Sequence, residues 1–499
     1  MIKANMMKPI RDPIRKSIRK TANKTAHKTA HKTARQPMVN FSGALSLGTV
    51  LLVCAQVLLH PVPAYARQAD ELKQAKEKLL APTITAVVNM KDLSERAEKG
   101  EALAQHRYGE MFEYGRGVKQ DIDEAIRWYR LAVAQSFAEA QASLGLLYAN
   151  GKGVKQDAVE AVRLYRLAAA QGNAMAQNNL GVQYARGQGV KQDNLEALKW
   201  YRLSAEQNYT TAQANLGAMY LNGNGVEQDY AVAMKWYRLA AVKNSLIAQN
   251  NIGLMYARGQ GVDQDFAEAA KWYKMAAERG LAAAQNNLAE QYIKGNGVEQ
   301  SFAEAVTWYR LAAAQGNATA QNNLGVRYER GEGVMQNSAT ASEWYRLAAE
   351  QGNIIAQNNL GVQLASGRGV KLDYVEAVKW FRLSADKGNA TAQVNLAFHY
   401  SKGQGVEKDD VQALKLYRLA AVQGDPVAQS SLGEIYEKGL EVTPDPVLAY
   451  MWYSLSALAA NTGAQKKRDS LAGKMTPDQI SKAEAKTIQC KKQKFENCL

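Results

Sequence analysis

Residue types that perform acid–base, nucleophilic or metal chemistry are sparse in this sequence of 499 residues. Of its five histidines, only His106 and His399 lie beyond the first 66 residues, and they are far apart in the chain. No histidines and cysteines cluster at the spacing of a zinc site or a Cys–His pair. We therefore interpret the two histidines as surface residues and not as a catalytic or metal-binding pair.

Gly-x-Gly segments such as Gly115–Gly117 and Gly151–Gly153 suggest phosphate binding at first sight. A phosphate-binding loop follows a strand and continues into Lys-Ser/Thr, and these segments have neither context. The Ser-x-x-Lys motif at residues 17–20 lies in a basic N-terminal leader. The sequence thus predicts no catalytic residue, no cofactor and no metal site, and so a protein that is not an enzyme.

The formal net charge of +15 is concentrated at the two ends of the chain. Residues 1–66 carry a net +10 and the last 35 residues a net +5, which leaves the residues between them neutral. A nucleic-acid-binding domain would present its basic residues along one folded face. The charge pattern therefore argues against nucleic acid as a partner.

Residues 1–66 have the order of a secretory signal, namely a basic leader, an apolar run over residues 41–59 and the small-residue motif Ala-Tyr-Ala that ends at Ala66. We expect cleavage after Ala66 and export to the periplasm or outside the cell. Three alternatives stay open: an uncut membrane anchor, a lipoprotein site at Cys54, and an organelle transit peptide. Contact with a membrane is expected only through this leader.

Only Cys490 and Cys498 follow the expected cleavage point. Two cysteines eight residues apart at the end of an exported chain favour a local disulfide. Two free thiols on a frayed tail are the alternative.

Most of the chain is one repeated unit. An alanine opens each of ten copies at a constant step of 36 residues: Ala104, Ala140, Ala176, Ala212, Ala248, Ala284, Ala320, Ala356, Ala392 and Ala428. Such a period indicates a solenoid in which each unit buries its apolar face against its neighbours.

One copy predicts two helices. In the copy that opens at Ala176, helix A has a buried face at helical spacing and ends at two turn glycines: Ala176, Leu180, Gly181 and Tyr184, then Gly187 and Gly189. Asp193 is expected to cap helix B, with Glu196 completing a capping box. Ten such pairs predict an all-α fold which, by analogy with tetratricopeptide arrays, is a right-handed α/α solenoid (superhelix).

The pattern A-x-x-x-L-G-x-x-Y-x-x-G-x-G-V-x-x-D-x-x-x-A-x-x-W-Y-x-x-A-A-x-x-G resembles the Sel1-like repeat, a relative of the tetratricopeptide repeat. The resemblance covers residues 104–463. Before it lie the leader (1–66) and an N-terminal capping half repeat (67–103), and after it C-terminal capping helices and a basic tail with the cysteine pair (464–499). Ala289 and Ala397 replace the packing glycine, which predicts wider helix spacing there.

We number each copy from its opening alanine as position 0. Positions 2, 3, 6 and 10 lie opposite the predicted core face of helix A, on the side that lines the concave groove of tetratricopeptide arrays. They form a hypothetical peptide-binding groove of amides, aliphatic side chains and cations: Asn178, Val182, Arg186, Asn250, Leu254, Arg258, Asn286, Asn322, Val326, Arg330, Asn358 and Val362.

Two roles are open for the asparagines. Those at position 3, from Asn179 to Asn395, are interpreted mainly as holding repeats in register. Those at position 2 are assigned to binding a peptide backbone, because an amide both donates and accepts. The basic residues of helix B are interpreted as a solvated outer face.

The resemblance implies a non-enzymatic scaffold for a protein or peptide partner, in an envelope regulatory, assembly or host-contact role. Two alternatives remain: a β-lactam-binding or hydrolytic enzyme of the cysteine-rich Sel1-like type, whose cysteine pair in each repeat is missing here, and an adaptor in endoplasmic-reticulum quality control. Glycan on the sequons at Asn208, Asn317 and Asn389 would favour the second. The oligomeric state is left open.

Overall fold

The computed structural model describes residues 90–493, 495 and 498. The basic leader, the apolar segment, Ala66 with its expected cleavage, and residues 67–89 of the expected half repeat lie outside the described residues. The chain divides into two units, residues 1–96 and 97–499. Of the first unit, the structure describes only residues 90–96, which begin helix α4 (Met90–Glu98).

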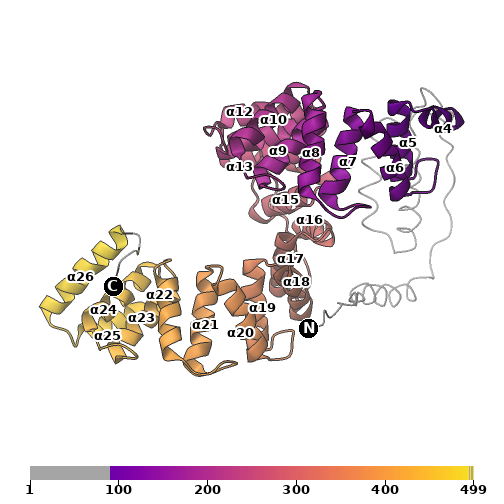
Figure 1. Ribbon diagram of the computed structural model, residues 1–499. Coiled ribbons are helices and arrows are strands. Elements are labelled where there is room, and N and C mark those ends of the chain that lie inside the picture. Colours follow the sequence, from indigo (N-terminus) through magenta and orange to yellow (C-terminus); the bar gives the residue numbers. More distant parts are fainter. Residues whose placement is uncertain (1–89, 494, 496–497, 499) are drawn as a thin grey trace, which may run out of the picture. The chain divides into compact units, whose positions relative to one another are not determined.

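The second unit is built of helices alone over its described residues, and helices that follow one another pack side by side (Figure 1). The A helices are α5(Ala102–Tyr114), α7(Ala138–Asn150), α9(Ala174–Arg186), α11(Thr210–Asn222), α13(Leu246–Arg258), α15(Ala282–Lys294), α17(Ala318–Arg330), α19(Ile354–Ser366), α21(Ala390–Lys402) and α23(Pro426–Lys438). The B helices are α6(Ile122–Ala134), α8(Ala158–Ala170), α10(Asn194–Glu206), α12(Tyr230–Val242), α14(Phe266–Glu278), α16(Phe302–Ala314), α18(Ser338–Glu350), α20(Tyr374–Ala385), α22(Asp410–Ala421) and α24(Pro446–Leu458). The predicted all-α solenoid of ten helix–loop–helix repeats is confirmed.

Side-chain caps start the helices where the sequence predicts them. Asp193 accepts hydrogen bonds from the backbone N–H groups of Leu195 (2.9 Å) and Glu196 (3.1 Å), which otherwise have no partner in the first turn of α10. The Glu196 carboxylate does not complete the expected capping box but accepts a bond from Lys199 (3.4 Å). The Glu196 and Lys199 side chains meet because residues three apart in an α-helix are neighbours on its surface.

The two glycines of each loop have different tasks. Gly187 ends α9 in the left-handed conformation (φ +67°), which a residue without a Cβ adopts most easily. Gly189 also has a positive φ, and a Cβ on it would lie 2.1 Å from the carbonyl oxygen of Ala158 in the preceding repeat. The Gly-x-Gly segments are therefore turns that allow close contact between repeats.

In eight of the ten repeats, the core contains a contact between a glycine and an aromatic ring. A Cβ added to Gly181 on α9 would lie 2.8 Å from the ring of Tyr201 on α10. In the sixth and ninth repeats Ala289 and Ala397 stand at the glycine position and are fully buried. The wider helix spacing expected at these two residues stays a prediction.

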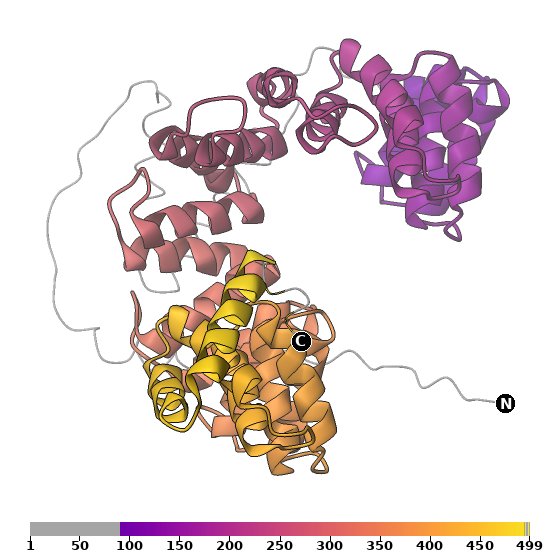
Figure 2. The same cartoon turned by 90° about the vertical axis from the view of Figure 1, so that its left-hand side faces the viewer.

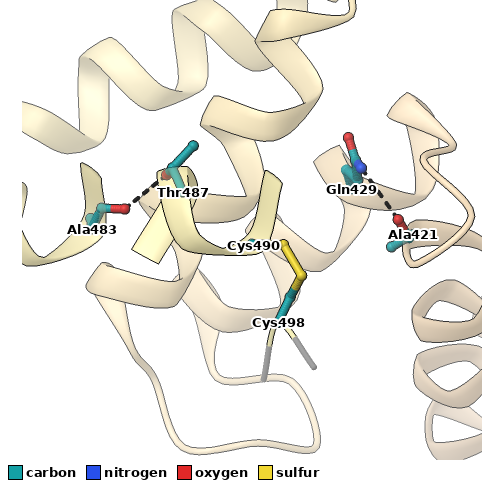
Figure 3. The surroundings of a disulfide bond; sticks show 6 residues. All are labelled: Ala421, Gln429, Ala483, Thr487, Cys490 and Cys498. Atoms are coloured by element: carbon teal, nitrogen blue, oxygen red, sulfur yellow. Dashed lines mark hydrogen bonds between the residues drawn. A yellow bond between two sulfur atoms is a disulfide. The ribbon is translucent and has the colours of Figure 1, made fainter. Parts of the chain in front are cut away.

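The C-terminal end is covered by two further helices, α25 (Thr462–Ala472) and α26 (Pro477–Lys492). Both pack on α24, and α26 lies beside it in Figure 1 and Figure 2. Cys490 at the end of α26 is joined to Cys498 by a disulfide, the pairing expected from the sequence, and both cysteines are buried (Figure 3).

The glycine–tyrosine contact predicts the effect of a larger side chain. Gly253→Leu should lower the free energy of unfolding by about 1–3 kcal/mol, since its Cβ would already lie 2.7 Å from the Tyr273 ring. Urea unfolding followed by circular dichroism measures the change. Ala267→Leu is the control, because Ala267 is exposed and Leu195 occupies the equivalent position in the third repeat. Equal unfolding midpoints for the two variants would contradict the packing argument.

Candidate binding surface of the A helices

The position-2 asparagines are buried, so their assignment to an open groove was wrong. The exposed fraction of these side chains is 3% for Asn178 and no more than 8% for the other four: Asn250, Asn286, Asn322 and Asn358. They are buried because the next A helix covers them, which the helical periodicity of a single copy does not reveal.

These asparagines form a ladder of amide hydrogen bonds between repeats. Each position-2 Oδ1 accepts a bond from the Nδ2 of the position-3 asparagine one repeat later, as Asn250 does from Asn287 (2.9 Å) and Asn322 from Asn359 (3.1 Å). The other bonds of this asparagine ladder are Asn215 to Asn178 (3.0 Å), Asn323 to Asn286 (3.4 Å) and Asn395 to Asn358 (2.9 Å). The amides are thus engaged inside the protein.

The position-3 asparagines are half-buried and also reach the core tyrosine of the preceding helix B. The amides of Asn179 and Asn251 lie near the phenols of Tyr165 and Tyr237. Burial raises the pKa of Tyr237 to about 12, and the nearby Asn251 amide partly offsets this effect. The structural interpretation of position 3 therefore agrees with its contacts.

A second amide ladder was missed by the sequence analysis. Position 1 is glutamine in all ten copies, and every one is buried: Gln105, Gln141, Gln177, Gln213, Gln249, Gln285, Gln321, Gln357, Gln393 and Gln429. Gln177 donates to the Ala169 carbonyl (3.3 Å) and accepts from Gln207 (2.7 Å), and Figure 3 shows the equivalent bond from Gln429 to Ala421. The presence of glutamine at position 1 of every copy was the signal that could have revealed this second ladder.

The arginines of the Trp-Tyr-Arg segments also have a structural partner, contrary to their interpretation as a purely solvated face. Arg166 donates its Nη2 to the hydroxyl of Tyr184 in the next repeat (2.9 Å). The same bond is made by Arg130, Arg202, Arg238, Arg310, Arg382 and Arg418. These guanidinium groups, all exposed except that of Arg418, connect successive repeats.

What remains accessible on the A helices is a strip of aliphatic and cationic side chains. The position-6 residues are half-buried and pack with one side on the core: Val182, Leu254, Val326 and Val362. The position-10 cations, one turn further on, are exposed: Arg186, Arg258 and Arg330. We call these two rows the A-helix strip; the position-2 asparagines do not belong to it.

Acidic residues interrupt the strip in the middle of the solenoid. Glu290 stands at position 6 of the sixth repeat and accepts a bond from Asn323 (3.0 Å). Glu329 accepts from the Tyr345 hydroxyl (2.7 Å) and from Gln363 (2.8 Å). The strip is therefore not uniformly basic, because acidic side chains lie beside its cations in the sixth and seventh repeats.

The two histidines are buried, with exposed fractions of 7% for His106 and 4% for His399, so their interpretation as surface residues was wrong. The His106 ring lies 3.1 Å from Ser143, which is the position of a bond in the asparagine ladder. The Nδ1 of His399 lies 2.9 Å from the Gln404 carbonyl oxygen, and its ring packs on Tyr374 and Phe381. Both are packing residues of their repeats.

Within the described part of the chain, no three His, Cys, Asp or Glu side chains gather as a metal site would require. A helix both long and apolar enough to cross a membrane is likewise not found among the described residues.

Comparison with known proteins places the repeats in a family. The Sel1 repeat matches residues 102–137, 138–173, 174–209, 210–244, 246–281, 282–317, 318–353, 354–389, 390–425 and 426–461. The chain belongs to the Sel1 repeat family, whose helical solenoids are typical of protein–protein interaction scaffolds and are generally not enzymes. No curated protein matches the chain.

Several solved structures are similar to it. One is c5321, described as a protective antigen of uropathogenic Escherichia coli with an SLR fold, at 36% identity over 82% of this chain and 96% of that chain, with a TM-score of 0.47. A Sel1 repeat protein from Oxalobacter formigenes shares 35% identity over 50% and 96% of the two chains (TM-score 0.46). A third, from Klebsiella pneumoniae, shares 22% over 40% and 97% (TM-score 0.30).

The asparagine ladder predicts a stability loss. Asn322→Ala leaves the Asn359 amide without its acceptor and should lower the free energy of unfolding by about 1–3 kcal/mol. The control is Asn222→Ala at the exposed end of α11, for which a change within about 0.5 kcal/mol is expected. Urea unfolding of both variants measures the difference. If Asn322→Ala cost no more than the control, the ladder would not stabilise the solenoid.

Burial of His399 predicts a pH dependence. Burial lowers the pKa of His399 from its ordinary value of 6.5, against the opposing effect of the Gln404 carbonyl. The unfolded chain then binds the proton more readily, so the free energy of unfolding should fall as the pH drops below about 6.5. His399→Gln, which introduces the residue found at this position in three other repeats, should reduce that fall. Thermal unfolding between pH 7.5 and 5.5 measures it, and parallel curves for the two proteins would refute the assignment.

Proposed function

We propose that this protein is an exported, non-enzymatic scaffold that binds a protein or peptide partner along the A-helix strip. The observation that carries the proposal is the repetition of half-buried aliphatic side chains beside exposed cations, as at Val326 and Arg330. An accessible apolar row on a protein surface is typical of a contact site. Adjacent cations favour acidic side chains or a terminal carboxylate.

The partner chemistry follows from what the strip lacks. Since the position-2 amides are engaged in the asparagine ladder, main-chain recognition by these side chains is not part of the proposal. Side-chain contacts remain: apolar residues of the partner would cover position 6, and its acidic residues would face position 10. Glu290 and the Glu329 region would select against acids in the middle of the bound segment.

Export to the periplasm or beyond the cell is part of the proposal and rests on the signal-like leader ending at Ala66. The Cys490–Cys498 disulfide supports it, because such bonds persist in oxidising compartments. Two of the three sequons have structural explanations that need no glycan. Asn317 and Asn389 cap helices by accepting bonds from the N–H groups of Ala320 (2.9 Å) and Ala392 (2.8 Å).

A charge-reversal pull-down tests the proposed site. The full chain, tagged at its C-terminus, is crosslinked in the cell envelope fraction as wild type and as the triple variant Arg258→Glu/Arg330→Glu/Lys402→Glu. The variant changes exposed position-10 cations only, so we expect it to fold and to lose its acidic partner by about tenfold. Quantitative mass spectrometry of the captured proteins measures the loss.

The matched control reverses three exposed cations of the B helices, Lys235→Glu/Lys379→Glu/Lys415→Glu. A partner retained by this control and lost from the first triple supports the A-helix strip. Loss from the control alone would move the binding site to the B helices. Covalent labelling of the chain by a β-lactam would replace the scaffold proposal with the enzyme alternative.

A further inference from the structure

The eighth repeat departs from the others at two positions that lie close together. Position 8 is leucine there, Leu364, whereas eight of the ten copies have tyrosine: Tyr148, Tyr184, Tyr220, Tyr256, Tyr292, Tyr328, Tyr400 and Tyr436. Position 16 is also leucine, Leu372, whereas the first seven copies have glutamine: Gln120, Gln156, Gln192, Gln228, Gln264, Gln300 and Gln336. Two polar residues of the repeat have thus become apolar at one place.

The missing tyrosine deprives an arginine of its usual acceptor. In seven pairs of repeats, Nη2 of the position-26 arginine donates to the next position-8 hydroxyl, at distances between 2.8 Å (Arg382 to Tyr400) and 3.3 Å (Arg130 to Tyr148). Arg346 faces Leu364 and cannot make this bond. Its Nη1 donates instead to Glu376 (2.7 Å), and this bond lowers the pKa of the Glu376 carboxyl. Among the described residues, its Nη2 has no hydrogen bond.

Without the glutamine, the eighth repeat lacks a hydrogen bond that spans this loop in the earlier repeats. In the seventh repeat, Gln336 donates to the Glu329 carbonyl (2.7 Å), and the equivalent bonds recur in the six repeats before it. Leu372 has no donor for this bond, and its side chain is 48% exposed. About half of this apolar side chain is not covered by its own chain, so that surface is available to a ligand.

Both leucines line one open hollow of about 540 Å³, between α18, α20 and the loop after α19. Its wall also includes Val370, the 54% exposed Val375, and the ion pair between Arg346 and Glu376. The volume falls within the range of about 300–1,000 Å³ typical of ligand sites. We call this hollow the repeat-8 pocket.

We propose that the repeat-8 pocket binds a tyrosine side chain of a partner protein, which supplies the phenol that this repeat lacks. In other repeats of this chain, the arginine at the equivalent position donates a hydrogen bond to a tyrosine hydroxyl. The proposed ligand would reproduce this contact at Arg346. The exposed side chains of Leu372 and Val375, with the buried Leu364 behind them, form the apolar wall that accommodates the ring, and the Nη2 of Arg346 donates to its hydroxyl.

The charges of the wall favour a neutral ligand. Arg346 is already paired with Glu376, and Lys371 and Asp373 of the same hollow have opposite charges, so the wall has no net charge that calls for an anion. A neutral phenol accepts a hydrogen bond from the guanidinium without the desolvation cost of a carboxylate. The site is separate from the A-helix strip, so the two proposals stand or fall independently.

The test is a titration of the full chain with p-cresol, the side-chain analogue of tyrosine, followed by NMR of its labelled leucine and valine methyl groups. Toluene, which has no hydroxyl, and p-toluate, which has a carboxylate, are the comparison probes. We expect saturable shifts at Leu372 and Val375 with p-cresol, and about tenfold weaker binding of toluene because one charge-assisted hydrogen bond is lost.

Two variants separate the parts of the site. Leu364→Tyr should fill the pocket with the chain's own phenol and weaken p-cresol binding at least about tenfold. Met335→Tyr adds a tyrosine at an 87% exposed loop position and should leave binding unchanged. Arg346→Gln keeps the apolar wall and should bring the affinity for p-cresol down to that for toluene. This variant tests the site even if Leu364→Tyr fails to fold.

Several outcomes would overturn the proposal: no saturable p-cresol binding, equal p-cresol affinity for wild type and folded Leu364→Tyr, equal affinities for p-cresol and toluene, or tighter binding of p-toluate than of p-cresol. The predicted order of affinities, together with its loss in Arg346→Gln, would support it.

Discussion

Everything in this structure depends on one constraint: a repeat of two short helices cannot bury its apolar face alone, so it must use its neighbours. The glycine–tyrosine contact brings the two helices of a repeat together, as at Gly181 and Tyr201. Amide side chains then fix the register between repeats. Because buried amides are costly unless they are paired, a repeat that slipped along its neighbour would lose several bonds at once.

The same constraint decides which polar residues are free to act on other molecules. Asparagine, glutamine and arginine recur at fixed positions of the repeat. If one copy is considered alone, their side chains are accessible and resemble a binding surface. In the array, each bonds to a neighbouring repeat: Asn250 to Asn287 and Arg166 to Tyr184 of the following repeat, and Gln177 to Ala169 of the preceding one. Repetition of a polar residue in a solenoid is therefore weak evidence for binding, since the repeated neighbour is itself a repeated partner.

Departures from the repeat carry more information about function than the repeat does. Where His106 meets Ser143, one pair of hydrogen-bonding residues has replaced another and the contact is kept. Where Leu364 replaces a tyrosine, the contact is lost, Arg346 changes partner and a hollow opens. The first kind of change preserves the solenoid, and the second creates a local property that the other repeats do not share.

The sequence by itself determined the repeat length, the two helices of each copy, their caps at residues such as Asp193, and the family, because these follow from local periodicity and turn chemistry. The pairing of Cys490 with Cys498 was also predictable, since only these two cysteines follow the leader. Only the tertiary structure decided that the position-2 asparagines and both histidines are buried, and that the helix B arginines bind tyrosines. A single helix shows which residues share a face, but the next repeat determines which face is covered.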